Sequence, residues 1–199
     1  GLLLFALSIT FAAFDWMMSL APHWFSTMYG VIYFGGAAMA TMALLSVVCI
    51  WLRSKGYLAS VVTAEHYHDL GKLMFAFMVF WAYTSFSQYM LIWYANLPEE
   101  TEWYQHRTHG GWNIVFVTLT LGHFLVPFAF LISRHMKRNF RTLAIGAVFL
   151  LVMHWFDMQF QVMPGLHPHG MHLEWTDFAS FTGLLGLGAL QGQVHEILP

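Results

Sequence analysis

Long apolar runs separated by short polar breaks form most of the chain. A membrane-spanning helix needs about 20 predominantly apolar residues, and four runs reach that length, at about residues 29–52, 70–94, 112–133 and 142–163. Shorter apolar runs lie at residues 1–14 and 177–191. The pattern predicts an all-α integral membrane protein, a multi-helix transmembrane bundle with about six helices in this chain.

We expect a single transmembrane domain over residues 1–191, followed by a polar tail at residues 192–199. The first apolar run begins abruptly, without Met and without the charged segment of a signal peptide. We therefore expect the chain to be the carboxyl-terminal part of a longer protein. The abrupt change to a polar tail also indicates that intervening residues are absent there.

Basic residues are concentrated in two of the polar breaks. Seven of the eight Lys and Arg residues lie in or beside the breaks near residues 53–72 and 134–141, and only Arg107 lies elsewhere. Cytoplasmic loops of membrane proteins carry an excess of Lys and Arg. The distribution therefore predicts that both basic breaks, both ends of the chain and the tail face the cytoplasm, whereas the other breaks lie outside.

Composition supports the membrane assignment and excludes several other classes. The chain is 58% hydrophobic and only 9% charged, which leaves too few polar side chains to cover a water-soluble globule of this length. A formal charge of -2 excludes a strongly basic nucleic-acid-binding protein. Cys49 is the only cysteine, so the chain forms no internal disulfide and no cysteine-ligated iron–sulfur cluster. We predict no metal ligands.

Tryptophan lies mainly near the ends of the apolar runs, which is typical of the aromatic belt at a membrane interface. Trp81 and Trp155 do not fit that belt, because each lies well inside a run.

Three ionisable residues within the last two long runs are candidates for chemistry, because such groups are costly in a bilayer. His123 lies near mid-membrane, about 16 Å into its helix, and Pro127 four residues later cannot donate a hydrogen bond to its carbonyl. His154 and Asp157 share one helix face and form a candidate proton relay, which Asp15 could approach. The alternative is structural, with a histidine bonded to a neighbouring helix and an interfacial ion pair.

A second set of candidates lies where the run at 70–94 enters from the cytoplasm. Its members exchange protons or form hydrogen bonds, and they are Glu65, His68, Asp69, Lys72, Tyr83, Ser87 and Gln88. One helix stripe holds Asp69, Lys72, Ala76, Val79 or Phe80, Tyr83 and Ser87, and it predicts a hydrated half-channel from the cytoplasm. The alternative interpretation is helix capping by Asp69 followed by packing through hydroxyl groups.

Histidine spacing also raises the alternative of a haem b-binding membrane cytochrome. His109 and His123 are fourteen residues apart, and His154 and His167 are thirteen apart. Pro164 should end the last long helix before His167, and His109 lies in a Gly-rich break. Only the pair His123 and His154 remains as a ligand set.

Several longer strings resemble the polysulfide-reductase-type membrane subunits of alternative complex III, most closely the second of these, the quinone-binding one. The similarity covers residues 15 to about 140, and these strings carry it: DWMMSL at 15–20, PHWFST at 22–27, HDLGKLMF at 68–75, FWAY at 80–83, FSQY at 86–89 and IWYANLPEE at 92–100.

The resemblance implies the last six of about ten spanning helices in a subunit of the bacterial inner membrane. It implies a respiratory or photosynthetic quinol:cytochrome c (periplasmic acceptor) oxidoreductase that uses menaquinol or ubiquinol. This chain would bind no haem or iron–sulfur cluster, which partner subunits would carry: a multi-haem cytochrome c and an iron–sulfur protein beside a sister membrane subunit. Its contribution would be to quinol oxidation, to coupled proton translocation, or to both. The alternative is a non-catalytic structural anchor for periplasmic redox subunits.

Overall fold

The protein is an all-α membrane bundle. The computed structural model describes residues 1–57, 61–167, 175 and 179, and within these residues it contains no strand. Five described helices are long and apolar enough to cross a membrane, at Leu3–Leu20, Met28–Ser54, Ala64–Ala95, Trp112–Leu131 and Phe140–Gly165. The helix expected at 177–191 and the tail at 192–199 lie outside the described residues.

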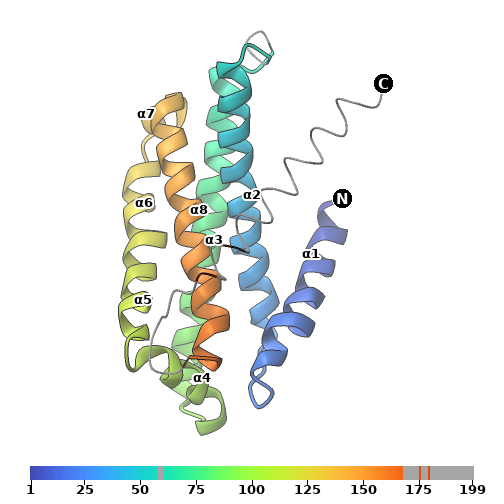
Figure 1. Cartoon of the computed structure of the whole chain (residues 1–199), viewed down its shortest axis with the longest axis vertical. Coiled ribbons are helices and arrows are strands. Elements are labelled where there is room, and N and C mark those ends of the chain that lie inside the picture. Colours follow the sequence, from blue (N-terminus) through green and yellow to red (C-terminus); the bar gives the residue numbers. More distant parts are fainter. Residues whose placement is uncertain (58–60, 168–174, 176–178, 180–199) are drawn as a thin grey trace.

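Twelve helical elements make up the described chain, and Figure 1 shows their arrangement. Several follow one another without a break, so that one spanning helix contains two or three elements. In chain order they are α1 (Leu2–Ala12), the π-helix η1 (Ala13–Met17), the 3-10 helix η2 (Met18–Leu20), α2 (Met28–Ser54), α3 (Ala64–Ala95), α4 (Pro98–Thr108), α5 (Trp112–Thr118), the π-helix η3 (Leu119–Leu125), α6 (Val126–Leu131), α7 (Arg134–Arg138), α8 (Phe140–Val162) and the 3-10 helix η4 (Met163–Gly165).

Three helices differ from the apolar pattern. The first continues past its expected end at residue 14, through η1 and η2 to Leu20. Helix α3 begins at Ala64, six residues before its apolar run, because Thr63 and His66 form a capping box in which the Thr63 backbone N–H donates to His66 Nδ1 at 3.1 Å. Helix α4 is amphipathic rather than apolar. It begins with Pro98 and carries acidic residues in its first turn and Arg107 in its last, which suits the helix dipole.

Helices α2, α3, α8 and the continuous α5–η3–α6 helix run along the long axis of the bundle, with α1 beside α2 (Figure 1). The approach of α1 to α2 depends on Gly30. A Cβ atom there would lie 2.5 Å from Cγ2 of Thr10, so only glycine permits this contact.

Buried side chains form an apolar core in the half of the bundle nearer α7 and aromatic clusters in the half nearer α4. The core near α7 consists of Met39, Ala43, Tyr67, Met74, Met78, Leu131, Leu143, Ala147 and Leu150. One aromatic cluster comprises Ala13, Trp24, Tyr29, Ile92, Trp103 and Tyr104, and the other comprises Trp112, Val115, Leu119, Met153 and Phe160. An apolar layer therefore separates one end of the bundle from the polar groups described below.

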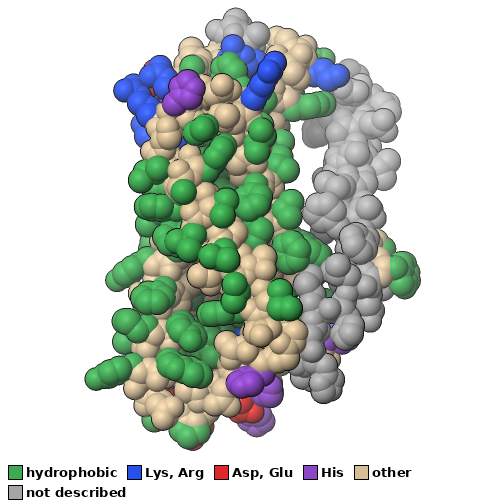
Figure 2. Space-filling model, turned by 90° about the vertical axis from the view of Figure 1, so that its left-hand side faces the viewer, with side chains coloured by type: hydrophobic (Ala, Val, Ile, Leu, Met, Phe, Trp, Pro, Cys, Tyr) green, Lys and Arg blue, Asp and Glu red, His purple; other side chains and the backbone are tan. Residues whose placement is uncertain are grey.

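The two basic breaks lie at the same end of the bundle. The end of α2, the start of α3 and helix α7 meet there (Figure 1), and Figure 2 shows Lys and Arg side chains gathered at that end. An ion pair between Arg138 and Glu65 joins α7 to α3. Helix α4 lies at the opposite end, as the charge distribution requires of a bundle with one cytoplasmic face.

The sides of the membrane can be assigned by cysteine labelling in a Cys49→Ala background. We expect a cysteine at Glu100 to react with a membrane-impermeant maleimide in intact cells, and a cysteine at Lys55 to react only after the membrane is opened. The two positions lie at opposite ends of the bundle, so they should never react from the same side. Labelling of Glu100→Cys only from the cytoplasm would reverse the topology.

Candidate functional site

A carboxylate buried between α3 and α8 is the centre of the candidate site. Asp157 is 3% exposed. Its Oδ2 accepts a hydrogen bond from Trp81 Nε1 at 3.1 Å, and its Oδ1 accepts one from Gln161 Nε2 at 3.4 Å. His154 Nδ1 lies 3.8 Å from Oδ2. Neither Lys nor Arg forms an ion pair with this carboxylate in the described part of the chain, so neutral donors provide its hydrogen bonds.

Two histidines extend this polar cluster towards η3. The centroid of the His123 ring lies 4.0 Å from that of Trp81 and 6.1 Å from that of His154. His123 is fully buried, and neither of its ring nitrogens has a hydrogen-bond partner among the described residues. The His154 ring packs directly against α2 at Gly36. A Cβ atom at that position would lie 2.9 Å from the His154 Cε1 atom. Unpaired buried nitrogens are costly, which distinguishes this cluster from an ordinary helix contact.

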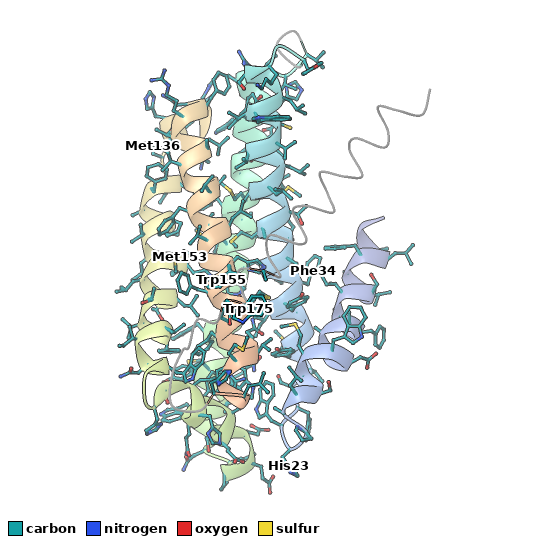
Figure 3. All side chains as sticks on the ribbon, viewed as in Figure 1. His23, Phe34, Met136, Met153, Trp155 and Trp175 are labelled. Carbon is teal, nitrogen blue, oxygen red and sulfur yellow. The ribbon has the colours of Figure 1, made fainter. Side chains whose placement is uncertain are left out.

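His123 lies in a π-helix, not at a simple proline kink. The π-helix η3 ends at Leu125, and α6 begins at Val126 with Pro127 in its first turn. Proline cannot donate to the carbonyl four residues before it, and the widened turn accommodates that loss. Met153 of α8 packs against η3 here (Figure 3), where a Cβ at Gly122 would lie 2.7 Å from the Met153 Cε atom. Short π-helices are frequent at functional sites.

A cavity of about 460 Å³ adjoins the carboxylate. Most of its wall is aromatic or aliphatic, and its polar lining includes Asp157, Gln161, Gln88 and Ser85. Within the described part of the chain, three of these polar side chains have a buried oxygen without a hydrogen-bond partner: Ser85 Oγ, Gln88 Oε1 and Gln161 Oε1. Acceptors of this kind, in an otherwise apolar space, match a ligand that is largely apolar and carries hydroxyl groups.

The cavity reaches the side of the bundle between α3 and η3. Tyr83, Phe86 and Leu125 line it, and they are 66%, 63% and 47% exposed. All three lie within spanning helices, so the opening is at membrane depth rather than at either end of the bundle. A molecule dissolved in the bilayer can enter there without crossing water.

Helix α4 closes the other end of the cavity through Trp103 and Tyr104, and Arg107 holds it in place. Arg107 Nε donates to the Phe160 carbonyl at 3.1 Å and Nη2 to the Gln161 carbonyl at 2.8 Å, which satisfies the last turn of α8. Nη1 donates to the Trp103 carbonyl at 3.1 Å, and the guanidinium lies 3.6 Å from the Trp103 ring centroid.

The charge of Arg107 persists at neutral pH although the side chain is only 5% exposed. Burial lowers its pKa to about 10, partly opposed by Tyr29 and Tyr104, and this value remains well above neutrality. Burial also raises the pKa of Tyr104, so its hydroxyl group remains a proton donor.

The candidates at the basic end form a separate set, exposed to solvent except for the half-buried His68. Lys72 Nζ lies 2.7 Å from Asp69 Oδ1, and His68 Nδ1 lies 4.0 Å from Glu65 Oε2. Along the predicted stripe, Asp69, Lys72, Ala76, Phe80 and Tyr83 are exposed on the outer face of α3. The stripe therefore does not line a path through the interior of the described bundle. The predicted helix cap at Asp69 is wrong, because Thr63 is the N-cap of α3 and Asp69 lies inside the helix, where it forms an ion pair with Lys72.

The structure thus brings together only some of the sequence-predicted residues. His123, His154, Asp157 and Gln88 lie at or beside the buried cluster, and Tyr83 lines the opening of the cavity. The members that lie elsewhere are the exposed Asp15 on η1, the half-buried Ser87, and the set at the basic end, namely Glu65, His68, Asp69 and Lys72.

Sequence reasoning did not include Trp81, Gln161 and Arg107 in the site. Trp81 gave a usable signal, because a tryptophan in mid-run does not fit an interfacial belt and a buried indole N–H needs an acceptor. Gln161 lies near the end of an apolar run, and the sequence contains no signal that it belongs to the site. Arg107 was interpreted only as the single basic residue of the outer breaks.

The fold and the site together define a multi-pass helical membrane protein with a buried carboxylate beside an apolar cavity that opens sideways at membrane depth. No protein-family model matches the chain, and a search of curated proteins finds no match either.

Proposed function

We propose that the chain is a membrane subunit of a bacterial quinol:cytochrome c (periplasmic acceptor) oxidoreductase related to alternative complex III, and that it provides a quinol site. The observation that carries the proposal is the cavity beside Asp157. Its volume falls within the usual range for small-molecule sites, roughly 300–1,000 Å³, and it combines aromatic walls with a few convergent acceptors.

The cavity has polar groups for the ring hydroxyls of a quinol and an apolar opening for its isoprenoid tail. The ring hydroxyls would donate to Asp157 and to the unpaired amide oxygens of Gln161 and Gln88. The isoprenoid tail would leave between α3 and η3, past Phe86 and Leu125, into the bilayer. A quinol is neutral, so the site needs hydrogen-bond acceptors and one base rather than a cluster of charges.

Oxidation of a quinol to a quinone releases two electrons and two protons. In the proposed site, Asp157 accepts the two protons in turn, the second after it has released the first to His154, while Trp81 and Gln161 hold its carboxylate towards the cavity. His154 lies 3.8 Å from the same carboxylate and can take the proton onward. The electrons pass to redox centres on the partner subunits, which are expected at the α4 side of the bundle.

The proposal favours release of these protons on the α4 side over conduction across the bundle. Asp157 lies about 7.5 Å from the end of α8, five residues at 1.5 Å each. Towards the opposite end, the buried apolar core with Met74, Met78 and Leu150 separates it from Glu65 and Asp69. A proton path from the cytoplasmic set would have to cross that layer.

A structural anchor for periplasmic subunits remains the second candidate, favoured by the exposed acidic first turn of α4. A haem between His123 and His154 has less support, because it would have to displace the Trp81 ring packed at 4.0 Å. The anchor predicts that changes in the cavity leave turnover unaltered.

The proposal is tested by filling the cavity. Ala82 lines it, and we expect Ala82→Phe to reduce labelling of the assembled complex by a photoreactive quinone analogue at least tenfold. Ala95 lies exposed on the same helix and outside the cavity, so Ala95→Phe is the matched control. Equal labelling of the two variants, in complexes with the same subunit content, would exclude this cavity as the quinol site.

A further inference from the structure

The basic end of the bundle, where α3, α6 and α7 meet, contains a buried lysine. Lys137 of α7 is only 8% exposed, although it is a lysine near the membrane surface. Its aliphatic stem packs over α3, since a Cβ at Gly71 would lie 3.1 Å from the Lys137 Cγ atom. Its Nζ lies 5.0 Å from the Phe75 ring centroid. The ammonium group is thus held in place rather than extended freely into water.

The surroundings of Lys137 lack a balancing anion. Within the part of the chain that the structure describes, Lys137 forms no ion pair, and the two nearby carboxylates of α3 are engaged elsewhere, Glu65 by Arg138 and Asp69 by Lys72. The local residues therefore comprise four cations, Lys72, Arg134, Lys137 and Arg138, against two carboxylates. Burial and the charge of Lys72 lower the pKa of Lys137. A bound anion would oppose this lowering.

An aromatic row extends from this ammonium group towards the middle of the membrane. The Phe75 and Phe128 ring centroids lie 5.4 Å apart, and Phe128 and Phe124 also lie 5.4 Å apart. All three rings are half-buried. Phe124 also lines the cavity beside Asp157, so the row leads from the basic end to that cavity. Exposed Leu73 and Ile132 on α3 and after α6 add apolar surface near the basic end.

We propose that this surface binds one anionic glycerophospholipid, with its phosphate at Lys137 and Arg134 and an acyl chain along Phe75, Phe128 and Phe124. Charge complementarity selects the headgroup, because basic pockets between spanning helices on the cytoplasmic side bind acidic lipids. The aromatic row at membrane depth favours a lipid over a free phosphate ion, because only a lipid has an acyl chain to place there. The cations favour an anionic lipid over a neutral quinol. This site does not depend on the proposed quinol chemistry.

The test measures lipid retention by native mass spectrometry of the purified protein with added phosphatidylglycerol or phosphatidylcholine. We expect Lys137→Gln to weaken phosphatidylglycerol retention about fivefold, the effect of one well-placed cation, and Lys137→Arg to restore most of it. Arg141 is exposed at the same end of the bundle, so Arg141→Gln removes the same charge and should have little effect.

Three results would overturn the proposal. An equal loss in Lys137→Gln and Arg141→Gln would mean diffuse attraction to the whole basic end. Equal retention of the two lipids by the unaltered protein would mean that the headgroup charge is not recognised. Displacement by millimolar inorganic phosphate would identify a free-anion site.

Discussion

Asp157→Asn is expected to lower quinol-driven reduction of the electron acceptor by the assembled complex about a hundredfold or more, the usual contribution of a positioned general base. Asparagine has nearly the same shape, and its side-chain oxygen can still accept the hydrogen bond from Trp81 Nε1. The variant therefore retains the packing of the site and loses the ability to take up a proton. Steady-state turnover with excess quinol is the measurement.

Two controls make this result interpretable. In the proposed complex, the haem content of the expected partner subunits would establish that the variant has assembled. Glu99→Gln changes an exposed carboxylate in the first turn of α4 and should leave turnover within about twofold of the unaltered complex. Unchanged turnover in Asp157→Asn would remove the carboxylate from the chemistry and favour the structural anchor.

Arg107→Ala is expected to destabilise the half of the bundle nearer α4 by about 3 kcal/mol or more, because hydrogen bonds from a charged donor contribute roughly 1.5–3 kcal/mol each. The substitution removes donors from three buried carbonyl groups, those of Trp103, Phe160 and Gln161. It also leaves a space beside the Trp103 ring. Thermal unfolding of the protein in detergent, followed by near-ultraviolet circular dichroism, should show a large fall in midpoint.

Comparison with two further variants separates geometry from charge. Arg107→Lys keeps the positive charge but cannot reproduce the planar set of three donors, so it should recover only part of the lost stability. Arg141→Ala removes an exposed arginine at the other end of the bundle and should change the midpoint little. A midpoint for Arg107→Ala equal to that of Arg141→Ala would contradict the proposed role of Arg107 in holding α4.

The apolar runs predicted the spanning helices because the bilayer imposes a length and a composition on any segment that crosses it. Helix α4 could not be predicted in the same way, since it is short and polar and its stability depends on contacts of Arg107 with α8. The start of α3 was also missed. Its first turn depends on the Thr63–His66 capping box, which involves a histidine rather than the usual Glu or Gln.

The sequence predicts individual residues of the candidate site. It does not predict which of them contact one another. His123, His154 and Asp157 were identifiable because ionisable groups are rare inside spanning segments. The contact that joins two helices at the site, from Trp81 to Asp157, links residues 76 positions apart, and no spacing rule connects two such positions. The stripe on α3 is a second example. Helical periodicity shows that its residues share one face of the helix, but not whether that face points into the bundle or away from it.

The amino-acid sequence is sufficient to identify a multi-pass helical membrane protein whose basic residues gather at one end, since both properties follow from the cost of placing polar groups in hydrocarbon. Which polar residues face inward depends on how the helices pack. Packing between α3, η3 and α8 buries Asp157 next to Trp81 and leaves a cavity beside it, whereas Asp69 and Lys72 remain on the outer face. Burial and contact are properties of several helices together, and no single helix encodes them.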